Sequence, residues 1–92
     1  MAKNRGKHTS VNRELKNAVM WLEQQEYVTK VVIGPYHNCR HNHRIGSLKY
    51  QRDVDAGLKI NGYCGDGIRD IFAYVDPIEK REIVKKSLES RF

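Results

Sequence analysis

The sequence predicts an α+β fold: a two-layer αβββα arrangement in which an antiparallel sheet of three to four strands carries the N- and C-terminal helices on one face. Three features predict it. Apolar residues recur with a helical period near the N-terminus, apolar and polar residues alternate through the middle, and a helix-start pattern precedes the last segment. Because neither amphipathic helix can leave its apolar stripe in water, both are expected to cover the same sheet face. The other face, or a loop edge, then stays available for a partner.

The N-terminal segment divides into a polar arm and a helix. Residues 1–8 lack an apolar period and carry three basic residues, so we expect a flexible basic arm before one α+β domain of residues 9–92. Thr9 or Ser10 can cap the helix that follows. This helix is expected to end near Gln25. Its buried stripe is predicted to consist of Val11, Leu15, Ala18, Val19 and Leu22.

Two strands are predicted in the next part of the chain. Residues 27–33 are rich in β-branched residues, and Gly34-Pro35 is expected to end this first strand. Residues 35–45 have no apolar period and predict a long, polar, basic loop. Residues 48–54 alternate in polarity, which predicts the second strand.

The remaining strands depend on the glycines. Gly57 is expected to bend or bulge the second strand before residues 58–60 continue it, as the same strand or as a fourth. Residues 61–67 contain three glycines and predict a turn. Residues 68–75 predict the next strand, with two faces that alternate along it. One face is expected to carry Ile68, Asp70, Phe72 and Tyr74, and the other Arg69, Ile71, Ala73 and Val75.

The C-terminal helix has the clearest local start pattern. Asp76, Pro77 and Glu79 occupy the capping, first and third positions that typically begin a helix. Its buried side is predicted to consist of Ile83, Val84 and Leu88.

Positive charge is concentrated in two parts of the chain. The net charge is +6, with three basic residues in the arm and five between residues 27 and 52, where no acidic residue occurs. A localised basic excess is typical of proteins that bind a polyanion such as nucleic acid. The predicted nucleic-acid-binding residues are Arg40, Arg44, Lys49 and Arg52, helped by His37, His41 and His43. RNA is favoured over DNA, because the charge falls on a predicted loop and strand and not on a recognition helix. Tyr36 and Tyr50 lie in the same stretch, where they could stack on unpaired bases.

The histidine-rich loop also admits a metal site. His37, Cys39, His41 and His43 could be ligands, completed by Cys64 or Asp66 from another loop. However, these potential ligands alternate within one short stretch, whereas structural zinc sites usually present two separated pairs. No metal and no cofactor are therefore predicted.

Two further function classes stay open. A small inhibitor or adaptor could dock its basic surface on an acidic protein. A nuclease could use His41 and His43 as acid and base, or carboxylates such as Asp53 and Asp70 with a divalent ion, but neither geometry is indicated by the sequence. Catalysis is the less favoured interpretation. No apolar run approaches the roughly 20 residues of a membrane span, and no apolar leader is present, so we expect a cytoplasmic protein without a membrane partner.

A partial resemblance concerns the order of elements and one short motif. The helix–strands–helix order and Gly34-Pro35-Tyr36-His37 resemble the double-stranded RNA-binding domain. The resemblance implies that His37 enters the RNA minor groove, and that the first helix and the start of the last helix contact the duplex. The lysine-rich start of that family's last helix is absent, because residues 76–79 read Asp-Pro-Ile-Glu. The acidic residues at this start would repel the phosphates of a duplex.

Overall fold

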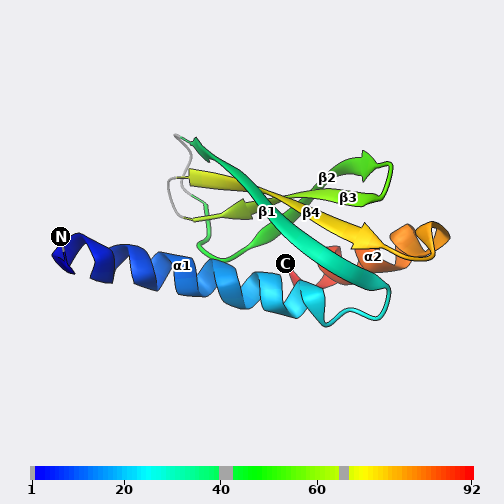
Figure 1. Ribbon diagram of the computed structural model, residues 1–92, viewed down its shortest axis with the longest axis horizontal. Helices are drawn as coiled ribbons and strands as arrows, with labels where there is room; N and C mark the ends of the chain where they lie inside the picture. Colours follow the sequence, from blue (N-terminus) through cyan, green and yellow to red (C-terminus); the bar gives the residue numbers. More distant parts are fainter. Residues whose placement is uncertain (1, 40–42, 65–66) are drawn as a thin grey trace.

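A helix, four strands and a second helix follow one another along the chain (Figure 1). The computed structural model describes residues 2–39, 43–64 and 67–92, with side chains from Arg13 onward. In chain order the elements are α1 (Ala2–Glu23), β1 (Val28–Asn38), β2 (Leu48–Val54), β3 (Gly57–Tyr63), β4 (Gly67–Val75), the 3₁₀ helix η1 (Ile78–Lys80) and α2 (Arg81–Arg91). The predicted α+β class is confirmed, with four strands.

The strands form one antiparallel sheet in the order β1-β4-β3-β2. The chain therefore passes from one edge strand, β1, to the other, β2, and then fills the centre with β3 and β4. Both helices lie against the same face of this sheet, α1 beneath β1 and α2 beneath β2 in the view of Figure 1. The opposite face carries no helix.

The core lies between the helices and the two central strands. Leu58, Ile60 and Ile71 have no exposed surface, and they pack with Leu22 of α1 and Leu88 of α2, which are equally buried. The predicted stripe of α1 is confirmed from Leu15 onward, since Leu15, Ala18, Val19 and Leu22 are all buried. Val11 lies outside the described side chains.

Gly62 lets α1 approach the sheet closely. A Cβ atom at this position would lie 2.7 Å from Cδ1 of Leu15 and 2.6 Å from Cδ1 of Ile71. Such distances are well inside van der Waals contact, so a larger residue would push the helix or the strand away.

Helix α1 differs from the prediction at both ends. It begins at Ala2 and not at Thr9 or Ser10, and it ends at Glu23, two residues before Gln25. A helix that is already nucleated gains one backbone hydrogen bond for each residue added, so it can extend into a polar segment. The flexibility expected for the arm stays a prediction.

The predicted end of the first strand was wrong. Strand β1 continues through Gly34-Pro35 to Asn38, with an irregular step in its pairing to β4 between Ile33 and Tyr36. Proline cannot donate a ladder hydrogen bond, but an edge strand with a bulge tolerates that loss. Residues 35–38 consequently belong to the sheet and not to the predicted loop.

The glycine-rich half of the sheet is a pair of hairpins. Asp55 and Ala56 form the turn between β2 and β3, so Gly57 starts a separate fourth strand instead of bending the second. A Cβ atom on Gly57 would collide with the carbonyl oxygen of Ala73 on β4, which explains the glycine. Strand β3 runs to Tyr63, further than the predicted turn over residues 61–67 allows.

The C-terminal helix starts differently from the expected capping box. Pro77 precedes the 3₁₀ turn, and neither η1 nor α2 has a side-chain hydrogen bond at its N-terminal cap. The predicted capping role of Asp76 is therefore wrong. Instead Nη1 of Arg81 donates a hydrogen bond to the carbonyl oxygen of Val54 at 2.7 Å, which ties the start of α2 to the end of β2. Val84 and Leu88 are buried as predicted, but Ile83 is 48% exposed. One residue along a helix turns the side chain by about 100°, which takes Ile83 off the buried face.

Candidate functional site

The side of the sheet without helices carries a mixed basic and aromatic surface. Alternate residues of β3 and β4 point to opposite faces, so the neighbours of buried Leu58, Ile60, Ile71 and Ala73 point away from the helices. The charged side chains of this side are Lys30, His37, Lys49, Arg52, Lys59 and Asp70, and the aromatic rings with exposed surface on β4 are Phe72 and Tyr74. We call this set the open face.

Strand register brings these distant residues together. Lys59 pairs with Phe72 on one side and with Arg52 on the other, so one cross-strand row holds two cations beside a ring. Lys30 pairs with Tyr74, and its Nζ lies 5.7 Å from the centroid of the tyrosine ring. Directly opposite residues on a sheet have Cβ atoms about 5 Å apart, so these cations act on the same small area.

Asp70 is the acidic member of the open face, and its charge is offset locally. One carboxylate oxygen lies 3.2 Å from Nε2 of His37, and the other lies 3.9 Å from Nζ of Lys59. The Asp70 side chain is only 15% exposed, whereas that of His37 is 56% exposed. The cations therefore dominate the charge that a ligand meets on this face.

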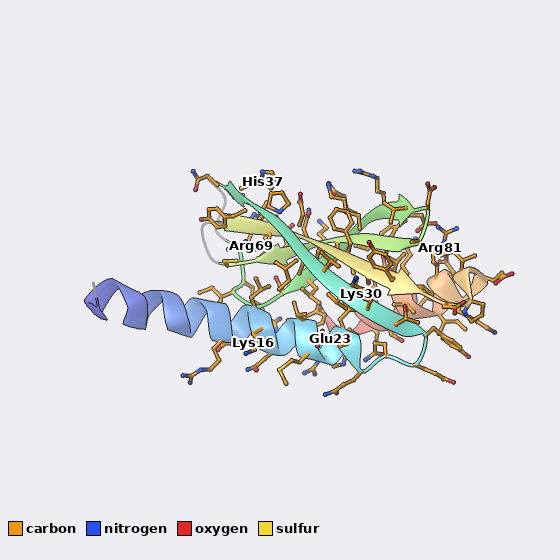
Figure 2. All side chains as sticks on the ribbon, in the orientation of Figure 1. Lys16, Glu23, Lys30, His37, Arg69 and Arg81 are labelled. Atoms are coloured by element: carbon orange, nitrogen blue, oxygen red, sulfur yellow. The ribbon has the colours of Figure 1, made fainter. Side chains whose placement is uncertain are left out.

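Three of the predicted binding residues lie on the open face. Lys49 and Arg52 are exposed on β2, and His37 is exposed near the end of β1, where Figure 2 labels it. Strand β1 therefore holds His37 in place of the predicted loop. A nucleic-acid role for these residues stays a prediction at this point.

The other predicted residues lie in the segment between β1 and β2. His43 is partly buried, with its ring stacked on Tyr63 at a centroid distance of 4.1 Å and its Nε2 3.0 Å from Sγ of Cys39. Arg44 is exposed, and its carbonyl oxygen accepts a hydrogen bond from the hydroxyl of Ser47 at 2.8 Å. Arg40 and His41 lie outside the described residues.

The two tyrosines singled out from the sequence are engaged elsewhere. The Tyr50 ring packs at the edge of the core, with Nζ of Lys85 4.4 Å from its centroid, and its hydroxyl donates a hydrogen bond to Asp53 at 2.8 Å. This hydrogen bond is the main reason that the pKa of Tyr50 is raised above its ordinary value. The Tyr36 ring lies over Gly67, where a Cβ atom would overlap it.

Sequence reasoning missed four members of the open face as binding residues: Lys30, Lys59, Phe72 and Tyr74. The alternation of residues 68–75 correctly placed Phe72 and Tyr74 opposite Ile71 and Ala73. The missing information was the register, because Lys59 becomes a neighbour of Phe72 only when β3 pairs with β4.

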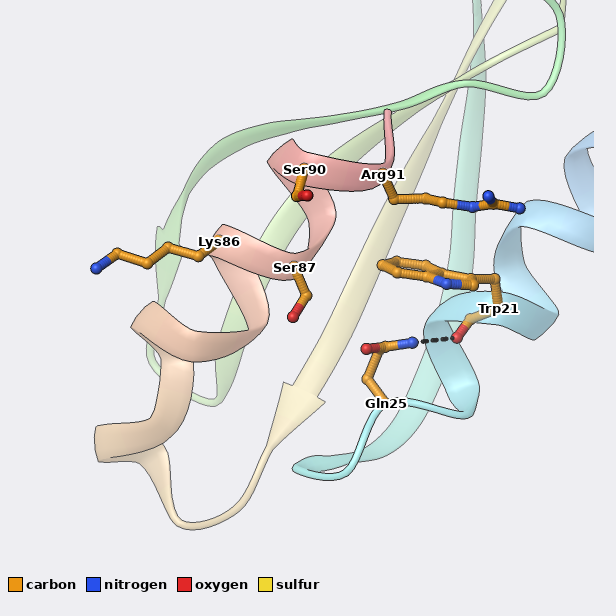
Figure 3. Close-up of a pocket in the computed structure, with 6 residues that line it drawn as sticks. All are labelled: Trp21, Gln25, Lys86, Ser87, Ser90 and Arg91. Atoms are coloured by element: carbon orange, nitrogen blue, oxygen red, sulfur yellow. Dashed lines mark hydrogen bonds between the residues drawn. The ribbon is translucent and has the colours of Figure 1, made fainter.

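A depression lies between the two helices, on the side of the sheet opposite the open face (Figure 3). It has a volume of about 520 Å³ and is lined by Trp21, Gln25, Lys86, Ser87, Ser90 and Arg91. Nε2 of Gln25 donates a hydrogen bond to the carbonyl oxygen of Trp21 at 3.0 Å, and the Trp21 ring meets the Phe92 ring edge-on at 5.2 Å. The lining contains neither a histidine nor a carboxylate, so this depression lacks an acid–base pair.

Within residues 2–39, 43–64 and 67–92 no group of three or more histidine, cysteine, aspartate or glutamate side chains is arranged to hold a metal ion. Among the helices in these ranges, none combines the length and the hydropathy that a membrane span requires.

Comparison of the chain with protein-family models, curated proteins and solved structures gives no match. The resemblance to the double-stranded RNA-binding domain therefore gains no support beyond element order and four residues, and the four-stranded sheet has one strand more than the αβββα order on which the resemblance rests. The geometry of the open face is the basis for a functional interpretation.

Proposed function

We propose that this protein binds nucleic acid, with RNA favoured over DNA, through its open face and the basic segment that precedes β2. The observation that carries the proposal is the charge of the open face. Three exposed permanent cations, Lys30, Lys49 and Arg52, share the surface with the Lys59–Asp70 ion pair, whose charges offset each other. Another carboxylate beside this surface is that of Asp55, at the β2–β3 turn. A concentrated positive surface attracts a polyanion and contributes most of the affinity through phosphate contacts.

The residues on the two edge strands would contact the nucleic acid in different ways. Arg52 can hold a phosphate with two parallel hydrogen bonds, while Lys49, two pairs closer to the start of β2, acts as a point charge. His37 adds an exposed polar contact near the opposite edge of the sheet. Such contacts fix the position of the nucleic acid and read little of its sequence.

The segment between β1 and β2 extends the proposed surface. Arg44 is exposed three residues before Ser47, close to the start of β2, and the partly buried His43 anchors this segment on Tyr63. Arg40 and His41 belong to the proposal by sequence alone. RNA is favoured because sheets and loops commonly bind RNA that is not a regular duplex, whereas DNA is most often read by a helix in the major groove.

Fluorescence anisotropy with labelled single- and double-stranded RNA and DNA tests the proposal between about 50 and 200 mM salt, where phosphate contacts lose much of their affinity. The double variant Lys49→Ala/Arg52→Ala should weaken binding and reduce the slope of log K against log salt by about 1.5 to 2. Lys16→Ala/Lys86→Ala is the matched control, because both lysines are exposed on the helices and Lys16 points away from the sheet (Figure 2).

Binding that the control retains and the β2 variant loses would support the proposal. Absence of binding to all four nucleic acids would overturn it, and a protein partner with an acidic surface would become the better interpretation. A cytoplasmic location stays a prediction.

A further inference from the structure

We infer that the open face holds its nucleic acid as a single strand, with unpaired bases stacked on Phe72 and Tyr74. This inference rests on the proposed function and names the class of nucleic acid that the same surface takes. Its starting point is that both rings lie on the helix-free side, where no element of the described chain covers them. Tyr74 is 39% exposed, and Phe72 is partly exposed.

The two rings form adjacent steps of one platform. They occupy alternate positions of β4, about 7 Å apart along the strand, and β4 is a central strand of the sheet. A central strand is rigid, because both of its edges are hydrogen-bonded, so the rings are presented on a fixed surface. Flat aromatic surfaces of this kind bind bases with little regard to sequence, since every base has a π-face.

A hollow beside the rings provides room for a base. A depression of about 270 Å³ lies between the turn of the β2–β3 hairpin and the two rings, beside Gly57, which pairs with Tyr74. Val54, Asp55, Phe72 and Tyr74 are among the residues that line it. The Asp55 carboxylate repels phosphates, but it can accept hydrogen bonds from the amino group of a base. The hollow is therefore suited to a base and not to the backbone.

Cations are placed on both sides of the rings. Lys30 lies over Tyr74 from the β1 side, whereas Lys59 and Arg52 follow Phe72 in the cross-strand row toward β2. A single strand with its bases over β4 can reach these cations with its phosphates. Alternation of stacking rings with cations along a backbone track is the general pattern of single-strand binding.

A duplex cannot use this arrangement. Its bases are already stacked and paired inside the helix, so the rings would meet sugars and phosphates and contribute no stacking. The cations would still attract a duplex, but only through the salt-dependent electrostatic contribution. The preference for a single strand should therefore depend on the rings, while the salt dependence should depend on the lysines and Arg52.

The test uses a labelled single-stranded RNA and the duplex formed with its complement, each titrated with the full chain. Phe72→Leu and Tyr74→Leu remove a ring but keep apolar bulk, so folding is preserved, and the urea midpoint of each variant checks this. Each should weaken single-strand binding on the order of 10-fold or more and leave duplex binding unchanged. Phe72→Tyr should retain wild-type affinity. Tyr36→Leu is the matched control, because its exposed ring lies over Gly67 and not on the open face.

The outcomes separate the two proposals. A single strand bound more tightly than the duplex, with the preference lost in both leucine variants, would support the inference. Equal affinity for single strand and duplex, or leucine variants that bind like the wild type, would overturn the inference while leaving nucleic-acid binding intact. Absence of binding to both RNAs would overturn the inference together with the preference for RNA, and absence of binding to DNA as well would overturn the proposed function itself.

Discussion

The two faces of the sheet come from the same strands but have opposite properties. On the helix-covered face, Leu58, Ile60 and Ile71 have no exposed surface. On the open face, their sequence neighbours Lys59 and Asp70 are charged and partly exposed. The comparison teaches that adjacent residues of β3 and β4 can serve separate purposes, because the side-chain period of a strand is two. Stability and binding should consequently be separable by substitutions only one residue apart.

The largest expected effect comes from Ile71 on the covered face. Ile71→Ala should lower the free energy of unfolding by about 2–5 kcal/mol, because it leaves a cavity among fully buried neighbours. A domain of this size has only about 5–15 kcal/mol in total, so the loss should be evident in urea denaturation. Phe72→Leu, one residue along β4, should cost less than about 1.5 kcal/mol. Equal losses at the two positions would break the comparison of the faces.

Two glycines on opposite faces give the next effect. Gly62→Ala should cost about 1–3 kcal/mol, because the new methyl group would lie 2.7 Å from Cδ1 of Leu15 in α1. Gly34→Ala is the matched control on the open face, where the nearest atoms, in Asp70 and Phe72, lie 3.3 Å from the new methyl group, so the crowding is smaller. A shift of the thermal midpoint that is larger for Gly34 than for Gly62 would contradict the assignment of α1 to the Gly62 face.

Removing the carboxylate of the open face should strengthen binding. Asp70→Asn should raise affinity for single-stranded RNA by about 5-fold, since one charge at roughly 4 Å in water is worth about 1 kcal/mol. The lost contacts with His37 and Lys59 should lower stability by no more than about 1 kcal/mol. Asp53→Asn is the control, because that carboxylate lies beside Tyr50 and not on the open face. A weaker affinity of Asp70→Asn, measured by anisotropy, would contradict a binding mode driven by phosphate contacts.

The smallest expected effect concerns the pKa of Tyr50, on the edge strand β2. Its pKa is raised chiefly by the hydrogen bond to Asp53, then by desolvation and by the charges of Asp53 and Glu82. Because the folded chain holds this proton more tightly than the unfolded chain, the stabilisation is complete below about pH 10 and is lost as the pH rises through the folded-state pKa. Asp53→Asn should lower the pKa of Tyr50 toward its ordinary value.

Tyrosinate absorbance measures this shift. The wild type and Asp53→Asn are each titrated with and without the additional substitution Tyr50→Phe. The difference within each pair isolates the titration of Tyr50 among the five tyrosines. An unchanged Tyr50 pKa in Asp53→Asn would show that the hydrogen bond is not its main cause.

Much of the candidate site was predictable, but not its most specific part. The absence of acidic residues between Glu26 and Asp53 pointed to Lys49, Arg52 and His37, which all lie on the open face. Lys59 lies outside that stretch. Lys30 lies within it, but on the edge strand β1, at the other side of the sheet from Lys49 and Arg52 on β2. Their relation to Phe72 and Tyr74 follows from strand order and register, which no local pattern contains.

The amino-acid sequence by itself determined the α+β class, the buried stripe of α1 from Leu15 onward, the burial of Val84 and Leu88 in α2, and the faces of β4. These features follow from periodicity, because burial of apolar residues repeats every 3.6 residues in a helix and every two in a strand. The tertiary structure alone decided that β1 continues past Pro35, that Gly57 starts a fourth strand, and which cations surround the aromatic rings. Strand ends and cross-strand neighbours depend on hydrogen bonds to a distant partner strand, so they are settled only when the sheet assembles.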